Sequence, residues 1–153
     1  MANLIILSGI PGAGKSTFVN THKWNESVVV LSTDQIRKRL TGDASCLDRD
    51  NEVWKFIYDT LARPHVNATY IVDATNIVAK RRKSYLEYKH NFDSIRLYCL
   101  LVDLEVALER NERRARHVPE DVIINMHKSL LKNMDAEDLL KAGYDEVRFI
   151  TNN

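Results

Sequence analysis

Apolar runs alternate with amphipathic segments along the whole chain. Short runs rich in Val, Ile and Leu predict buried strands at residues 4–7, 27–31, 69–72, 95–102 and 146–150. Between them, apolar residues recur every three or four positions, which predicts helices at 15–22, 33–40, 48–62, 79–90, 104–116, 119–131 and 137–141. Thr33 or Asp34 is expected to cap the helix over 33–40. Strands that alternate with helices indicate an α/β fold, a parallel sheet of about five strands with helices on both faces.

Length and composition indicate one domain over residues 1–153. Hydrophobic residues make up 44% of the chain and charged residues 28%, and the net charge is +1, so any attraction to nucleic acid must be local. No apolar stretch reaches membrane length, and we expect no membrane partner. Because the first predicted strand begins almost at Met1, we expect no targeting segment and a cytoplasmic location, in the cell or in an infected host cell.

The first strand is followed by a glycine-rich phosphate-binding motif. Gly9, Gly14, Lys15 and Ser16 fit the pattern G-x-x-x-x-G-K-[ST], with a strand before and a helix after it. The glycines let backbone N–H groups face phosphates, Lys15 can reach the β- and γ-phosphates, and the Ser16 hydroxyl can hold Mg²⁺. This predicts binding of ATP, or another nucleoside triphosphate, with Mg²⁺ at Gly9, Gly12, Ala13, Gly14, Lys15, Ser16 and Thr17. The alternative is a glycine-rich turn that fits the motif by chance.

Ligands of parallel sheets sit at the carboxyl ends of strands, so the residues after the second strand also matter. Asp34 follows that strand, and Arg37 shares its helix face at i+3. A carboxylate that accepts the proton of an attacking hydroxyl, beside a guanidinium that holds a substrate phosphate, suits a kinase. The alternative is a helix-capping Asp34 with a surface Arg37.

The third strand ends in Asp73-Ala74-Thr75-Asn76. Asp73 occupies the position of an acidic residue that helps bind Mg²⁺ in phosphate-loop proteins, but no Glu follows it, which argues mildly against ATP hydrolysis as the main activity. Thr75 and Asn76 offer neutral polar groups for a substrate phosphate or sugar. The alternative is a capping or turn cluster.

Arginines gather after the fourth strand. Arg110, Arg113, Arg114 and His117 are spaced i, i+3, i+4 and i+7, which predicts that one helical face carries them. An Arg-rich helical lid of this kind would close over the triphosphate and stabilise charge on the transferred phosphoryl group. The alternative is a solvated face whose arginines pair with neighbouring glutamates.

Together these motifs resemble the 5′-kinase domain of phage-type polynucleotide kinase, within the small P-loop kinases. The matching segments are Gly9 to Thr17, Asp34-x-x-Arg37, Asp73 to Asn76, Arg110-Asn111-x-x-Arg114 and Val118-Pro119-x-Asp121-Val122, and they cover almost the entire chain. The first segment occurs in many NTPases; the second and fourth are the more specific in combination.

The resemblance implies a role for each of these positions. Asp34 is expected to be the general base for a 5′-hydroxyl, and Arg37 to bind the phosphate on the 3′ side of the acceptor, assisted by Thr75. Lys15 and Arg114 are expected to neutralise the ATP phosphates. Other expected contributions are cofactor contacts from Arg110 and substrate contacts from Asn76 and Asp73.

The sequence therefore predicts a kinase that transfers the γ-phosphate of ATP to the 5′-OH end of DNA or RNA. One alternative is a kinase for a small alcohol, such as a nucleoside or sugar, which has no 3′-side phosphate for Arg37. The other is a nucleotide-binding ATPase module without an acceptor, which does not need Asp34-x-x-Arg37. Two further clusters stay open: Trp54 and Tyr58 could stack a base or belong to the core, and Arg81-Arg82-Lys83 could contact nucleic acid or face solvent.

Overall fold

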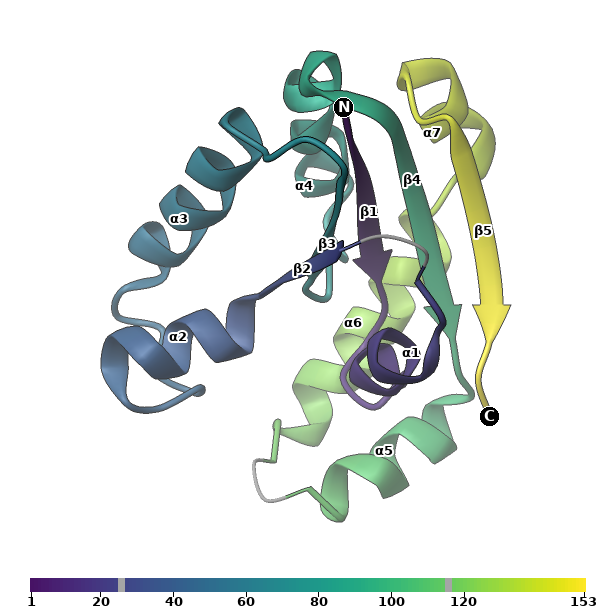
Figure 1. Cartoon of the computed structure of the whole chain (residues 1–153). Coiled ribbons are helices and arrows are strands. Elements are labelled where there is room, and N and C mark those ends of the chain that lie inside the picture. The colour runs from purple at the N-terminus through teal and green to yellow at the C-terminus, as the bar shows by residue number, and fades with distance from the viewer. Residues whose placement is uncertain (25–26, 115–116) are drawn as a thin grey trace.

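The computed structural model describes residues 1–24, 27–114 and 117–153 and holds one parallel sheet within them. Its order is β2-β3-β1-β4-β5, and every neighbouring pair is parallel. The strands are β1 (Ala2–Ser8), β2 (Ser27–Ser32), β3 (Ala68–Asp73), β4 (Phe92–Leu101) and β5 (Glu146–Thr151). The predicted five-stranded parallel sheet is confirmed (Figure 1).

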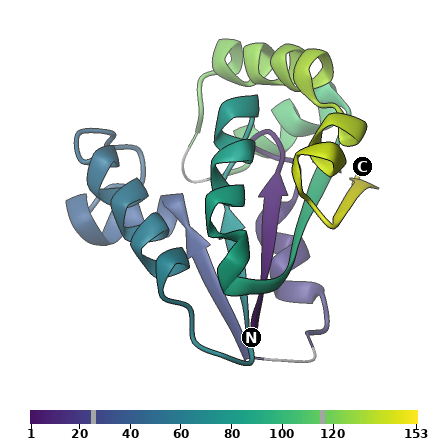
Figure 2. The ribbon, with the colours of Figure 1, turned by 90° about the horizontal axis from the view of Figure 1, so that it is seen from above.

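Helices cover both faces of this sheet. In Figure 1, α1 lies in front of the sheet while α4, α6 and α7 lie behind it, and Figure 2 shows the same layers from above. No helix in the described residues is both long and apolar enough to cross a membrane. The helices are α1 (Lys15–Thr21), α2 (Thr33–Thr41), α3 (Asp50–Ala62), α4 (Ala79–Ser84), the 3₁₀ helix η1 (Tyr85–Asn91), α5 (Leu104–Glu112), α6 (Glu120–Asn133) and α7 (Ala136–Ala142).

Some helix limits differ from the sequence prediction. The segment predicted as one helix over 79–90 changes from α4 to the 3₁₀ helix η1, and the predicted helix over 48–62 begins at Asp50. The cap of α2 is Ser32, whose Oγ accepts a hydrogen bond from the Gln35 N–H at 3.3 Å, so the predicted capping by Thr33 or Asp34 is wrong. Since Ser32 performs the capping, the Asp34 side chain is not used as the helix cap.

The register of the sheet aligns the ends of three strands. Asp73, the last residue of β3, pairs with Leu7 of β1 on one side and with Ser32 of β2 on the other. Beyond this row, the Gly9 N–H donates to the Thr75 carbonyl at 2.9 Å. The loops that follow β1, β2 and β3 therefore start side by side, which places three of the predicted motifs at one edge of the sheet.

Candidate active site

The phosphate-binding motif adopts a turn that its glycines make possible. Gly12 and Gly14 have φ angles of 88° and 91°, in the left-handed region, and Gly14 is the residue before α1. A Cβ atom on Gly12 would lie 2.7 Å from the Ala107 carbonyl oxygen in α5. The loop therefore packs directly on the backbone of α5, and only glycine fits at this contact.

The Lys15 ammonium lies inside this loop. Its Nζ donates to the carbonyl oxygens of Gly9 at 3.1 Å and Ile10 at 3.3 Å. Burial lowers the pKa of Lys15, and Asp73 and Asp34 oppose this effect by attraction. Arg114 lowers the same pKa further by repulsion. Two cationic and two carboxylate side chains from four separate segments therefore act on one another at this place.

Asp73 lies at the end of β3, facing this centre. Burial raises the pKa of its carboxyl group, the Lys15 ammonium opposes that rise, and Asp34 adds to it by repulsion. The structure therefore brings Asp73 together with Lys15 and Asp34. The predicted role of Asp73 in binding substrate stays a prediction.

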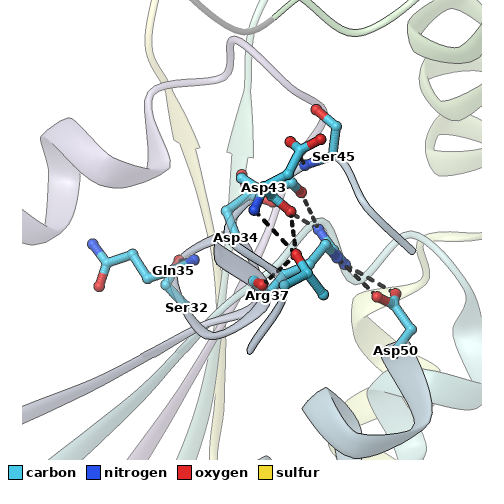
Figure 3. Close-up of polar contacts among 9 residues, drawn as sticks. Ser32, Asp34, Gln35, Arg37, Asp43, Ser45 and Asp50 are labelled. Carbon is cyan, nitrogen blue, oxygen red and sulfur yellow. Dashed lines mark hydrogen bonds and ion pairs between the residues drawn. The ribbon is translucent and has the colours of Figure 1, made fainter. Parts of the chain in front are cut away.

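Asp34 and Arg37 form an ion pair that a third residue extends. Figure 3 shows the Arg37 guanidinium between two carboxylates. Nη1 donates to Asp34 Oδ1 at 3.1 Å, while Nε and Nη2 donate to the two Asp50 oxygens at 2.8 and 3.0 Å. Nη1 also donates to the Ala44 carbonyl at 3.1 Å. The Arg37 side chain is only 9% exposed, so the alternative of a surface arginine beside a capping aspartate is wrong.

The electrostatics of this cluster keep Arg37 charged. Hydrogen bonding to Asp50 is the largest cause that raises the pKa of Arg37, and Asp34 adds to it. The Asp34 side chain is 45% exposed, so its carboxylate also faces solvent. Asp50 was not among the predicted site residues; the only signal in the sequence is an acidic residue in the first turn of a helix.

Thr75 and Asn76 lie in the loop after Asp73, and they make different contacts. The Thr75 carbonyl accepts from Gly9 N–H, and Thr75 lines a cavity described below. Asn76 is 3% exposed; its Nδ2 donates to the Leu7 carbonyl at 2.6 Å and its Oδ1 accepts from the Tyr85 hydroxyl at 2.6 Å. The Asn76 amide therefore holds the loop, whose φ of 46° at Asn76 is left-handed; Asn76 also lines that cavity, and its predicted contact with substrate stays a prediction.

The arginine-rich segment is only partly helical. α5 ends at Glu112, so the prediction that Arg110, Arg113, Arg114 and His117 share one helical face is wrong. Asn111, which is 3% exposed, lies one residue before the end of α5. Its Nδ2 donates to the Val118 carbonyl at 2.7 Å, and its Oδ1 accepts from the Val118 N–H at 2.9 Å. The last part of the predicted helix, residues 115–116, lies outside the described residues.

Two arginines of this segment belong to the site and one does not. Arg110 Nη1 donates to the Gly12 carbonyl at 3.0 Å, so α5 braces the phosphate-binding loop. Arg114 is partly buried and acts electrostatically on Lys15. Arg113 pairs with Glu109 on the exposed side of α5, as the alternative of a salt-bridged face described.

A residue after the last strand also supports the loop, and no motif in the sequence indicated it. Asn152, just after β5, donates from Nδ2 to the Ala13 carbonyl at 2.9 Å, and its N–H donates to the Leu101 carbonyl at 2.8 Å. Its amide would lie against a Cβ at Gly14. The loop is therefore held from α5 on one side and from the segment after β5 on another.

The basic cluster at residues 81–83 has structural contacts. Arg82 is 1% exposed and donates to the carbonyls of Asn76, Ile77 and Asn133 at 2.7 to 3.1 Å. Arg81 lies over the Trp54 ring, with its guanidinium carbon 3.7 Å from the ring centroid. Lys83 pairs with Asp138. Arg82 therefore neither faces solvent nor is free to contact nucleic acid.

Comparisons with known proteins show the family and the fold of the chain. A curated relative, the L-seryl-tRNA(Sec) kinase of Methanococcus maripaludis, is 30% identical over an alignment of 171 positions that covers 94% of this chain and 62% of the relative. The chain therefore spans less than two thirds of that relative's length.

Solved structures share the fold. A chain of the Pnkp1/Rnl/Hen1 RNA repair complex has a TM-score of 0.72 at 21% identity, covering 88% of this chain and 46% of that one. A gluconokinase from Sinorhizobium meliloti has a TM-score of 0.55 at 16% identity, covering 97% of this chain and 82% of the other. These likenesses support the predicted P-loop kinase fold. Since the AAA domain profile (AAA_33) matches residues 4–136, the chain belongs to the AAA domain family and has the α/β fold of P-loop kinases.

Proposed function

We propose that this chain is a polynucleotide 5′-hydroxyl kinase of the phage type, which transfers the γ-phosphate of ATP to the 5′-OH end of DNA or RNA. The observation that carries the proposal is the nearly buried Arg37, held between Asp34 and Asp50 at the carboxyl end of β2. An arginine fixed in this way, next to a carboxylate that faces solvent, suits an acceptor that carries both a hydroxyl and a phosphate.

The donor side of the site fits a nucleoside triphosphate with Mg²⁺. The left-handed Gly12 and Gly14 turn the loop so that backbone N–H groups would face the phosphates, and Lys15 brings a desolvated ammonium that an anionic ligand would stabilise. Ser16 lies exposed at the start of α1, where its hydroxyl would hold Mg²⁺. When bound, Mg²⁺ neutralises charge on the β- and γ-phosphates. Thr17, Arg110 and Arg114 complete the proposed donor site.

The acceptor side is formed by Asp34, Arg37 and Thr75. Four of the five N–H donors of Arg37 are used by Asp34, Asp50 and Ala44. Among the described residues this leaves one N–H of Nη2 for the phosphate on the 3′ side of the acceptor nucleotide. Asp73 lies between the two halves of the site, in register with Ser32.

In the transfer itself, Asp34 accepts the proton of the 5′-hydroxyl as its oxygen bonds to the γ-phosphorus. The bond from that phosphorus to the β-γ bridging oxygen breaks, and ADP leaves with the electron pair. Lys15 and Arg114 stabilise the charge on the phosphoryl oxygens during the step. Asp34 keeps its orientation through the hydrogen bond from Arg37.

A second candidate is a kinase that phosphorylates the hydroxyl of a seryl group carried on tRNA. The observation that favours it is the 30% identity to an L-seryl-tRNA(Sec) kinase. In that case Arg37 would bind a phosphate of the tRNA end, and Asp34 would accept the proton of the seryl hydroxyl. Kinase action on a small alcohol and ATP turnover without an acceptor remain the other outcomes to test.

The deciding experiment uses purified protein, Mg²⁺ and ATP labelled in the γ-phosphate. The acceptors are a 5′-OH oligonucleotide of DNA or RNA, a nucleoside 3′-monophosphate, an unphosphorylated nucleoside, gluconate and seryl-tRNA. We expect label on the first two and not on the nucleoside. Label on seryl-tRNA alone would favour the second candidate, and label on the nucleoside or gluconate alone would favour a small-alcohol kinase. Release of phosphate that no acceptor changes would indicate an ATPase.

A further inference from the structure

A cavity of about 410 Å³ lies beside the acceptor site. Its lining comes from α3, the loop after β3, α4 and α6, and includes Trp54, Thr75, Arg81, Val122, Asn125 and Met126. Trp54, Val122 and Met126 supply apolar surface, whereas Arg81 and Asn125 supply polar groups. Flat apolar walls with a few hydrogen-bonding groups suit an aromatic heterocycle such as a nucleobase.

Two elements, the loop after β3 and α3, connect the cavity with the proposed acceptor site. Thr75, two residues after Asp73, lines it directly. On α3, Trp54 lies four residues after Asp50, so both share one helix face and Trp54 is about 6 Å further along the helix than the Arg37 contact. Trp54 and Thr75 therefore place the cavity next to the residues that would bind the 3′ phosphate of the acceptor.

The wall of the cavity is already arranged for stacking. The Arg81 guanidinium lies 3.7 Å from the centroid of the Trp54 ring, and its Nη1 donates to the Tyr58 hydroxyl at 2.8 Å. That hydroxyl also shares a 2.7 Å hydrogen bond with Ser84 Oγ. The guanidinium is therefore fixed against the indole at the wall of the cavity, and little ordering is needed before a base can stack there.

We propose that this cavity binds the base of the second nucleotide of the acceptor, stacked on the wall formed by Trp54 and Arg81. The inference rests on the proposed polynucleotide kinase function. The first nucleotide presents its 5′-hydroxyl to Asp34 and its 3′ phosphate to Arg37, and the next base enters the cavity. The cavity then distinguishes a polynucleotide from a mononucleotide.

The test compares three acceptors: a nucleoside 3′-monophosphate, a dinucleotide with a free 5′-OH, and the same dinucleotide without its second base. We expect the wild type to use the dinucleotide about 5- to 100-fold better, in kcat/KM, than the form without the second base, as stacking predicts. Trp54→Ala should remove this preference and leave kcat/KM for the nucleoside 3′-monophosphate within about twofold. Trp54→Phe should retain much of it.

The matched control is Phe56→Ala, which removes an aromatic ring from the same helix at a position 49% exposed and outside the cavity. This variant should behave as wild type with all three acceptors. Equal losses with every acceptor in Trp54→Ala, or a wild type that ignores the second base, would overturn the proposal.

A binding measurement separates this inference from the proposed function. The chain has two tryptophans, so fluorescence of the Trp24→Phe variant reports on Trp54 without any turnover. The dinucleotide should quench this fluorescence, and the form without the second base should not. If the protein labels no 5′-OH acceptor, the proposed function is wrong. If the quenching does not depend on the second base, the cavity proposal is wrong, whatever the activity.

Discussion

Arg37 of α2 and Asp50 of α3 form a two-point ion pair, with Nε–Oδ1 and Nη2–Oδ2 distances of 2.8 and 3.0 Å. The pair joins two helices and fixes the plane of the guanidinium that we assign to the acceptor phosphate. Side-by-side bonds of this kind define orientation as well as charge. Asp50 therefore acts as a positioning residue for the proposed reaction.

Asp50→Ala should lower kcat/KM for a nucleoside 3′-monophosphate by about 100-fold, because a misplaced guanidinium no longer meets the phosphate. Loss of a partner for a buried charged group should also lower the free energy of unfolding by about 1–3 kcal/mol. The dissociation constant of ATP should not change, which separates positioning from general damage.

The control for Asp50 is Asp59→Ala, which removes an exposed ion pair with Lys55 on the same helix. Its effect on stability should be below about 0.5 kcal/mol, with unchanged kinetics. An Asp50→Ala protein that keeps wild-type use of the 3′-phosphorylated acceptor would refute the positioning role.

Asp34→Asn should reduce transfer to a 5′-hydroxyl about 10²- to 10⁴-fold, because the amide still accepts from Arg37 but takes no proton. ATP affinity, measured by titration calorimetry, should stay near wild type since the phosphate-binding loop is untouched. Asp43→Asn, in the neighbouring loop where Asp43 accepts from the Ser45 N–H, is the control (Figure 3). Near-normal transfer by Asp34→Asn would exclude Asp34 as the base.

The raised pKa of Asp73 predicts that the stability of the folded protein depends on pH. A carboxyl group with a folded-state pKa above its usual value of 3.8 binds more protons folded than unfolded, so its stabilising contribution is full at low pH and is lost as pH rises through the folded-state pKa. Asp73→Asn should therefore be more stable than wild type at pH 7, and the advantage should shrink as pH falls toward the usual carboxyl range. Urea unfolding at several pH values measures this; a difference independent of pH would contradict it.

Gly12→Ala should destabilise the protein and weaken ATP binding. Gly42 offers a matched comparison, because its φ of 82° resembles the 88° of Gly12 but a Cβ there would meet nothing within 4 Å. Gly42→Ala should cost about 1–2 kcal/mol for the left-handed backbone alone. Gly12→Ala should cost more, since its Cβ meets the Ala107 carbonyl at 2.7 Å. Equal losses of stability in the two variants would show that the contact with α5 is unimportant.

The fold was predictable because each element carries a local signal. The five apolar runs became five strands, and the Gly-x-x-x-x-Gly-Lys-Ser spacing located the phosphate-binding loop. Strand order placed three motifs at one edge, as parallel packing requires. What the sequence could not give were contacts between segments far apart, such as Asn152 with Ala13 or Asp50 with Arg37.

Two features of the site could not be predicted for the same reason. Asn76 follows a strand end, like Asp34, and its amide bonds to Leu7 and Tyr85, partners that its local sequence does not indicate. The periodic arginines suggested a continuous helix, but the buried Asn111 bonds to Val118 and α5 ends at Glu112. Residues spaced three or four positions apart share a face only within a continuous helix, and Arg113 and Arg114 lie beyond the end of α5.

The buried Arg82 side chain connects segments of the fold that are far apart in the sequence. Its guanidinium donates hydrogen bonds to the Asn76 and Ile77 carbonyls, in the loop that carries Thr75, and to Asn133 at the end of α6. Its own carbonyl accepts from the Tyr144 hydroxyl, which comes from the segment after α7. Hydrogen bonds of one residue thus join the loop after β3, the end of α6 and the turn before β5, and we expect a displacement of any one of them to shift the edge of the sheet where we place the chemistry.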